Sequence, residues 1–125
     1  MKKITTLALV AFVGVAIIAV APAPAAEALH LQLDASMPAA GQTLEASPEK
    51  IVLEFSERPE LAVARVAIDN AKLGKITRSE EDETILWVAV EEPLAAGTHT
   101  VNWVTSSGDG HPVTGEFSFT VSARR

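Results

Sequence analysis

Residues 51–56 read Ile-Val-Leu-Glu-Phe-Ser and alternate between apolar and polar side chains. Successive side chains of a β-strand point to opposite faces, so Ile51, Leu53 and Phe55 share one face while the polar side chains take the other. This period of two is typical of a strand with one face in a core and the other in solvent.

Runs of the same kind recur from His30 onward, with almost no helical periodicity between them. They lie at residues 30–34, 63–68, 75–79, 84–90, 98–105 and 116–121. Proline, glycine, aspartate and asparagine separate them, as turns require. About seven strands in a chain of this size predict an all-β, seven-stranded immunoglobulin-like β-sandwich.

The last two predicted strands can line one core. Val101 and Trp103 share a face on the first of them, and Phe117 and Phe119 share a face on the second. The loop between them, residues 106–112, is therefore expected to be held between two rigid strands. A loop placed in this way can preorganise ligands.

The first 28 residues have the layout of a secretory signal peptide. Lys2 and Lys3 form a short positive region, residues 4–20 form an apolar run, and residues 21–28 form a stretch rich in small residues that is broken by Pro22 and Pro24. We expect cleavage after Ala28, which leaves a single domain of residues 29–125. The alternative is an uncleaved anchor, because the apolar run is nearly long enough to cross a bilayer.

Composition narrows the class of protein. The whole chain has 10 basic and 16 acidic residues, and the predicted signal peptide contains Lys2, Lys3 and Glu27. The predicted mature chain therefore has 8 basic and 15 acidic residues, a net charge of −7. Nucleic acid is not an expected partner, because phosphate binding needs a basic face. A membrane contact is expected only through the signal segment before cleavage. The chain has no cysteine, so neither disulfides nor a thiolate metal site is available.

One loop motif carries candidate metal ligands. In Asp109-Gly110-His111-Pro112, the carboxylate and the imidazole are two residues apart and can reach one metal ion. The spacing is also common in ordinary turns. His30 lies next to the predicted mature terminus, where a free amine, backbone amides and an imidazole can converge on copper(II). Its alternative role is a solvated histidine at a strand start.

Three other polar features have simpler interpretations. His99 shares a face with Val101 and Trp103, so we interpret it as a core or edge residue. Glu57 can act as a further ligand or accept an imidazole N–H, or it can be a solvated loop carboxylate. The acidic run at residues 80–83 lacks the ligand alternation of a calcium loop and is interpreted as a solvated turn.

Three stretches together resemble the CopC family of periplasmic copper-binding, copper-resistance proteins. They are residues 30–44, 52–57 and 103–121, so the resemblance covers essentially the whole predicted mature chain. The third stretch carries, in order, Trp103, Ser106, Asp109-Gly110-His111-Pro112, Gly115, Phe117 and Phe119. The resemblance implies a Greek-key β-sandwich located in the periplasm or extracytoplasmic cell envelope.

The resemblance also implies a ligand set. Copper(II) would be held by His30, Asp109 and His111, with Glu57 as a possible peripheral or supporting residue. In the family the histidine is the N-terminal residue and coordinates through its own amine and ring. Here Leu29 precedes it, so a chain cleaved after residue 28 would chelate through the Leu29 amine, the His30 amide nitrogen and the His30 ring.

The expected function is that of a copper(II) carrier or buffer in copper resistance or homeostasis, and not that of an enzyme. The resemblance implies a membrane copper transporter of the CopD type as a partner. The mature chain keeps only Met37, so a methionine-rich copper(I) site is not expected.

Two alternatives differ in class. A histidine-brace oxidative copper enzyme is disfavoured by the short chain and by an aromatic content of 5%. A metal-free immunoglobulin-like interaction domain would use the same fold without a site.

Overall fold

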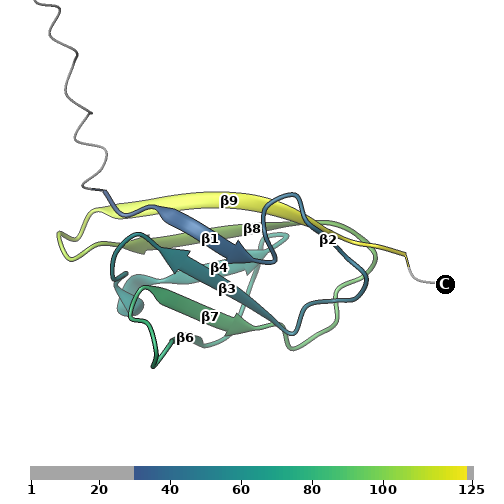
Figure 1. The fold of residues 1–125 in the computed structure, drawn as a ribbon, viewed down its shortest axis with the longest axis horizontal. Coiled ribbons are helices and arrows are strands. Elements are labelled where there is room, and N and C mark those ends of the chain that lie inside the picture. Colours follow the sequence, from purple (N-terminus) through teal and green to yellow (C-terminus); the bar gives the residue numbers. More distant parts are fainter. Residues whose placement is uncertain (1–29, 124–125) are drawn as a thin grey trace, which may run out of the picture.

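The computed structural model describes residues 30–123, and almost every element in this range is a β-strand (Figure 1). The predicted signal peptide, residues 1–28, and Leu29 lie outside the described residues. The elements are β1 (Leu33–Met37), β2 (Thr43–Leu44), β3 (Lys50–Phe55), the 3-10 turn η2 (Leu61–Val63), β4 (Arg65–Ile68), β5 (Ala71–Lys72), β6 (Ile76–Arg78), β7 (Ile85–Ala89), β8 (Gly97–Ser106) and β9 (Pro112–Val121). Within residues 30–123, no helix has the length and apolar character needed to cross a membrane.

The strands form two sheets that pack as a sandwich. One sheet has the order β1-β3-β7-β6, and the other has the order β2-β9-β8-β4-β5. Every pair of neighbouring strands is antiparallel except β2 and β9, which are parallel. Figure 1 shows strands of both sheets running along the long axis of the molecule. The predicted all-β sandwich is confirmed.

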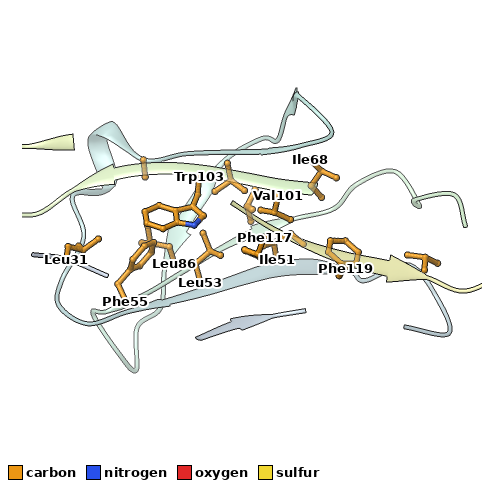
Figure 2. Packing of buried hydrophobic residues seen from close by; sticks show 14 residues of the cluster. Leu31, Ile51, Leu53, Phe55, Ile68, Leu86, Val101, Trp103, Phe117 and Phe119 are labelled. Carbon is orange, nitrogen blue, oxygen red and sulfur yellow. The ribbon is translucent and has the colours of Figure 1, made fainter. Parts of the chain in front are cut away.

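The core lies between the two sheets and follows the predicted alternation. Ile51, Leu53 and Phe55 of β3 are at most 3% exposed. Phe55 meets Trp103 of β8 edge to face, with ring centroids 5.2 Å apart and an interplanar angle of 77° (Figure 2). Burying each such side chain contributes about 1.5–3 kcal/mol. The contact between the rings joins the two sheets directly.

The bounds of several predicted strands were wrong. The first strand was predicted at residues 30–34, but pairing with β3 begins only at Leu33 and has an irregularity before Ala35. The last strand begins at Pro112 instead of Glu116, because β8 and β9 pair without interruption down to Ser106 and Pro112. The two-residue strands β2 and β5 were not predicted, since two residues are too few to show a period.

Three segments meet at one end of the sandwich. The Ser56 amide donates to the Gln32 carbonyl at 2.8 Å, and the Glu60 amide donates to the Ser106 carbonyl at 2.8 Å. These bonds tie the segment 56–60 to the start of the described chain on one side and to the end of β8 on the other. Figure 1 shows the chain entering β1 and the β8–β9 turn at this same end, which we call the turn end.

Candidate metal centre

The β8–β9 turn, residues 107–111, presents the predicted Asp-Gly-His motif. The Gly110 amide donates to the Ser107 carbonyl at 3.1 Å, which closes the turn. Gly110 has a φ of +81°, a left-handed conformation that glycine adopts without a steric penalty. The turn thereby brings Asp109 and His111 to the same side.

The carboxylate of Asp109 is held by its own turn. Oδ1 accepts hydrogen bonds from the Ser107 hydroxyl at 2.6 Å and from the His111 amide at 2.9 Å. These bonds, with the Ser107 hydroxyl as the largest influence, lower the pKa of Asp109 to about 2. Asp109 is therefore ionised across the whole neutral and mildly acidic range.

Asp109 and His111 form a pair that is open to solvent. Nδ1 of His111 lies 3.2 Å from Oδ2 of Asp109, and the two side chains are 81% and 52% exposed. Nitrogen and oxygen donors stand about 2 Å from a first-row metal ion, so two neighbouring donors at right angles are about 2.8 Å apart. The pair is thus already close to the separation that one ion requires.

His30 lies at the turn end but does not close a cluster with this pair. Its side chain is exposed, and the next residue, Leu31, is 1% exposed in the core. Figure 2 shows Leu31 at the same end of the core as Phe55 and Trp103. In the part of the chain that the structure describes, no three His, Cys, Asp or Glu residues are grouped so that they could hold a metal ion.

Glu57 is exposed in the segment 56–60, which the structure fixes at several points. Arg78 donates to the Pro59 carbonyl, and the Thr105 hydroxyl donates to the Glu60 carbonyl at 3.0 Å. The segment therefore holds Glu57 at the turn end, although Glu57 is not grouped with Asp109 and His111 as a metal ligand.

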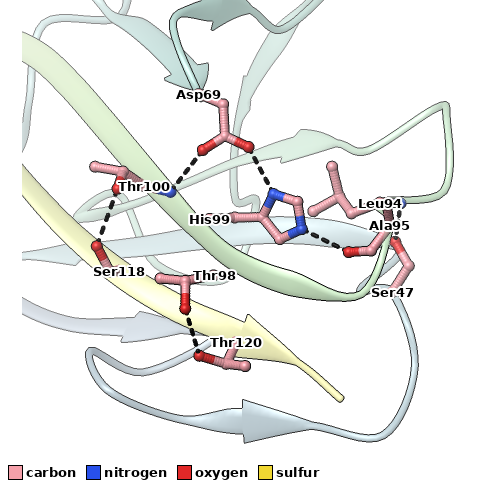
Figure 3. Close-up of polar contacts among 9 residues, drawn as sticks. All are labelled: Ser47, Asp69, Leu94, Ala95, Thr98, His99, Thr100, Ser118 and Thr120. Atoms are coloured by element: carbon pink, nitrogen blue, oxygen red, sulfur yellow. Dashed lines mark hydrogen bonds and ion pairs between the residues drawn. The ribbon is translucent and has the colours of Figure 1, made fainter. Parts of the chain in front are cut away.

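His99 lies near the opposite end of β8, and its ring is fully engaged (Figure 3). Nδ1 is 2.6 Å from Oδ2 of Asp69, and Nε2 is 2.7 Å from the Ala95 carbonyl. The Ala95 carbonyl, followed by Asp69, raises the pKa of His99. Its side chain is 11% exposed, as predicted for a core or edge residue. A ring that donates from both nitrogens has no lone pair for a metal.

Ser107 is a residue of this turn that the sequence did not single out. Its side chain is buried and its hydroxyl contacts Asp109 directly. Serine and aspartate are both common in turns. Their spacing in the sequence therefore does not show whether the serine hydroxyl bonds to the aspartate or faces solvent.

Comparison with known proteins places this fold in a family. The family model described as the CopC domain matches residues 33–122. Protein YobA from Escherichia coli K12 is 35% identical over 97 residues, covering 74% of this chain and 78% of the relative. Copper resistance protein C from Escherichia coli is 33% identical over 104 residues, covering 74% of this chain and 81% of the relative.

Solved structures agree with this assignment. CopC from Methylosinus trichosporium OB3b superposes with a TM-score of 0.68 at 27% identity, covering 77% of this chain and 97% of that protein. PcoC, a methionine-rich copper resistance protein from Escherichia coli, superposes with a TM-score of 0.63 at 33% identity, covering 74% of this chain and 99% of that protein. The match to the family model spans the described sandwich from β1 to the end of β9, and the chain belongs to the CopC family.

Proposed function

We propose that this protein binds one copper(II) ion at the turn end of the sandwich and acts in copper resistance or homeostasis. The observation that carries the proposal is the 3.2 Å approach of His111 Nδ1 to Asp109 Oδ2. This pair of solvent-exposed donors belongs to a chain whose relatives include proteins named copper resistance protein C.

The donor chemistry fits copper(II). One carboxylate and imidazole nitrogens are ligands that this ion accepts in a tetragonal arrangement. Soft sulfur ligands are nearly absent, because the chain has no cysteine and its methionines are Met1 and Met37. Met37 is 67% exposed on β1. One thioether cannot build a copper(I) site of the soft type, so we propose that this protein handles copper(II) alone.

His30 is the proposed third residue of the site. Leu31 is anchored in the core, and the Gln32 amide donates to the Ser56 hydroxyl at 2.9 Å. These anchors hold the chain next to the exposed His30 at the turn end, and copper binding would require His30 to move toward Asp109 and His111. If the exported chain begins at Leu29, the Leu29 amine and the His30 amide nitrogen join the ring as donors.

Glu57 has a supporting role in this proposal. Its segment is fixed at the turn end by the contacts of Pro59 and Glu60 with β6 and β8. A carboxylate there can accept the free N–H of a ligating imidazole or a water on the ion. It would tune the site without being required for it.

A carrier or buffer is the role that this arrangement favours. A pair of ligands that is 81% and 52% exposed lets a second protein approach the ion and take it over. We propose delivery to a membrane copper transporter of the CopD type, in the periplasm, after removal of residues 1–28. The aromatic content of 5% does not favour a broad substrate face of the kind that oxidation of a polysaccharide would need.

Native mass spectrometry of the exported protein tests the proposal, because it reports the mature N-terminus and the bound metal together. We expect a chain that begins at Leu29 and takes up one copper(II) ion, and a double variant Asp109→Ala/His111→Ala that takes up none under the same conditions. Absence of copper uptake by the wild type, or equal uptake by the double variant, would overturn the proposal.

A further inference from the structure

We infer that Ser107 is a positioning residue of the metal site, which fixes the Asp109 carboxylate so that one chosen oxygen faces the ion. The inference rests on the proposed copper function, which it deepens by assigning different tasks to the two oxygens of Asp109.

The two oxygens of Asp109 have different surroundings. Oδ1 accepts from the Ser107 hydroxyl at 2.6 Å and from the His111 amide at 2.9 Å. A carboxylate oxygen has about two lone-pair directions, so these two donors occupy Oδ1. Oδ2 lies 3.2 Å from His111 Nδ1 and is the oxygen that remains for a metal.

Ser107 can impose this orientation because it is itself fixed. Ser107 as a whole residue is 8% exposed, whereas the side chain of Asp109 is 52% exposed. The Ser107 carbonyl accepts the Gly110 amide at 3.1 Å, so the backbone and the hydroxyl are both held within the turn. Without the hydroxyl, the His111 amide would be the one remaining donor to Oδ1 of a solvent-exposed carboxylate. Binding would then require ordering of that side chain, which lowers affinity.

Ser106 provides a matched control beside it. It is 4% exposed, and its carbonyl accepts the Glu60 amide. Among residues 30–123, none forms a hydrogen bond with the Ser106 hydroxyl. Replacing either Ser106 or Ser107 by alanine therefore removes one hydroxyl oxygen from a buried serine. Of the two hydroxyls, that of Ser107 contacts a proposed ligand, Asp109.

The test is a copper(II) competition titration of full-length exported protein against a chromophoric chelator at fixed pH. Loss of a residue that supports a metal ligand costs about 10–100-fold in affinity, and we expect a weakening in that range for Ser107→Ala. Ser106→Ala is expected to bind as the wild type does, and Ser107→Thr, which keeps the hydroxyl, is expected to bind more tightly than Ser107→Ala.

A double-variant comparison separates positioning from a general structural effect. In an Asp109→Ala background, Ser107→Ala is expected to cause no further loss of residual affinity, because no carboxylate remains to be positioned. Equal losses in Ser106→Ala and Ser107→Ala, or an additive loss in the Asp109→Ala background, would overturn the inference while leaving copper binding intact. A wild type that binds no copper would instead overturn the proposed function and this inference with it.

Discussion

His111 Nδ1 lies 3.2 Å from Asp109 Oδ2, within a turn that holds the carboxylate by two further hydrogen bonds. The two donors share one side of the β8–β9 turn. In the proposed binding mode, copper(II) would then order the exposed His111 imidazole and His30. The proposed binding of copper(II) depends on that arrangement.

Replacement of His111 is expected to reduce copper(II) affinity strongly with little change in stability. His111→Gln removes a proposed ligand that is 81% exposed, so the loss should exceed about 100-fold, the upper range for a merely supporting residue. Chelator competition and thermal unfolding would measure the two effects. The matched control is His99→Gln, because both ring nitrogens of His99 are occupied by Asp69 and Ala95. A larger loss of copper binding in the control would contradict the site.

Acidification is expected to release copper through the histidines and not through Asp109. The lowered pKa of Asp109, about 2, keeps its carboxylate ionised at pH values well below neutral. Metal ligation requires neutral imidazole, and histidine generally changes charge in the mildly acidic range. Copper retention measured by equilibrium dialysis should therefore fall as the pH is lowered from 7 to 4. Unchanged retention at pH 4 would exclude this ligand set.

The pair of His99 and Asp69 is expected to make folding stability depend on pH. The raised pKa of His99 means that its contribution is fully present below the unfolded value of 6.5 and is lost as the pH rises through the folded value. Asp69 has a lowered pKa, because the Thr100 amide and then His99 donate to it. Its contribution is present above 3.8 and is lost as the pH falls through the folded value.

The stability gap between wild type and His99→Gln is therefore expected to be largest between these limits, near pH 5, and to shrink in alkaline solution. Urea unfolding of both proteins at several pH values measures it. Figure 3 shows the contacts concerned, which link the β4–β5 turn and the connection before β8 to His99. A gap that grew with rising pH would contradict the assignment of a protonated ring.

Gly115 is expected to tolerate no side chain. A Cβ built there would lie 2.5 Å from Cζ2 of Trp103, whose buried ring fills the core beside it. Gly115→Ala should destabilise the fold by about 1–3 kcal/mol, as overpacking of a core does. Gly74→Ala is the control, since its Cβ would meet only Glu91 at 3.9 Å. Equal denaturant midpoints for the two variants would contradict this prediction and show that the Trp103 ring moves aside to accommodate a Cβ at residue 115.

The sequence predicted the faces of the strands well, because one-sided burial imposes a period of two that is readable in runs such as residues 51–56. It predicted the proximity of Asp109 and His111 for a related reason, since residues two apart in an extended backbone point to the same side. It did not predict the start of β1 or the two-residue strands β2 and β5. Those are set by pairing with partners distant in the chain, for which local spacing carries no signal.

The contact of Ser107 with Asp109 illustrates the same limit at the scale of single atoms. The presence of a serine in the turn is visible in the sequence, but the 2.6 Å contact depends on how the turn closes through Gly110. The position of His30 depends on a segment that hydrogen bonds join to Ser56, just past the neighbouring strand β3. A prediction from spacing reaches the proximity of Asp109 and His111 but not the position of His30.

A crystal structure of the exported protein loaded with copper(II) tests the central claim most directly. We predict a single ion bound by Asp109 Oδ2, the His111 imidazole and His30, with the Ser107 hydroxyl still donating to Oδ1. An ion bound elsewhere, for example beside His99 and Asp69, or an ion held by Asp109 and His111 while His30 stays apart from it, would contradict the account.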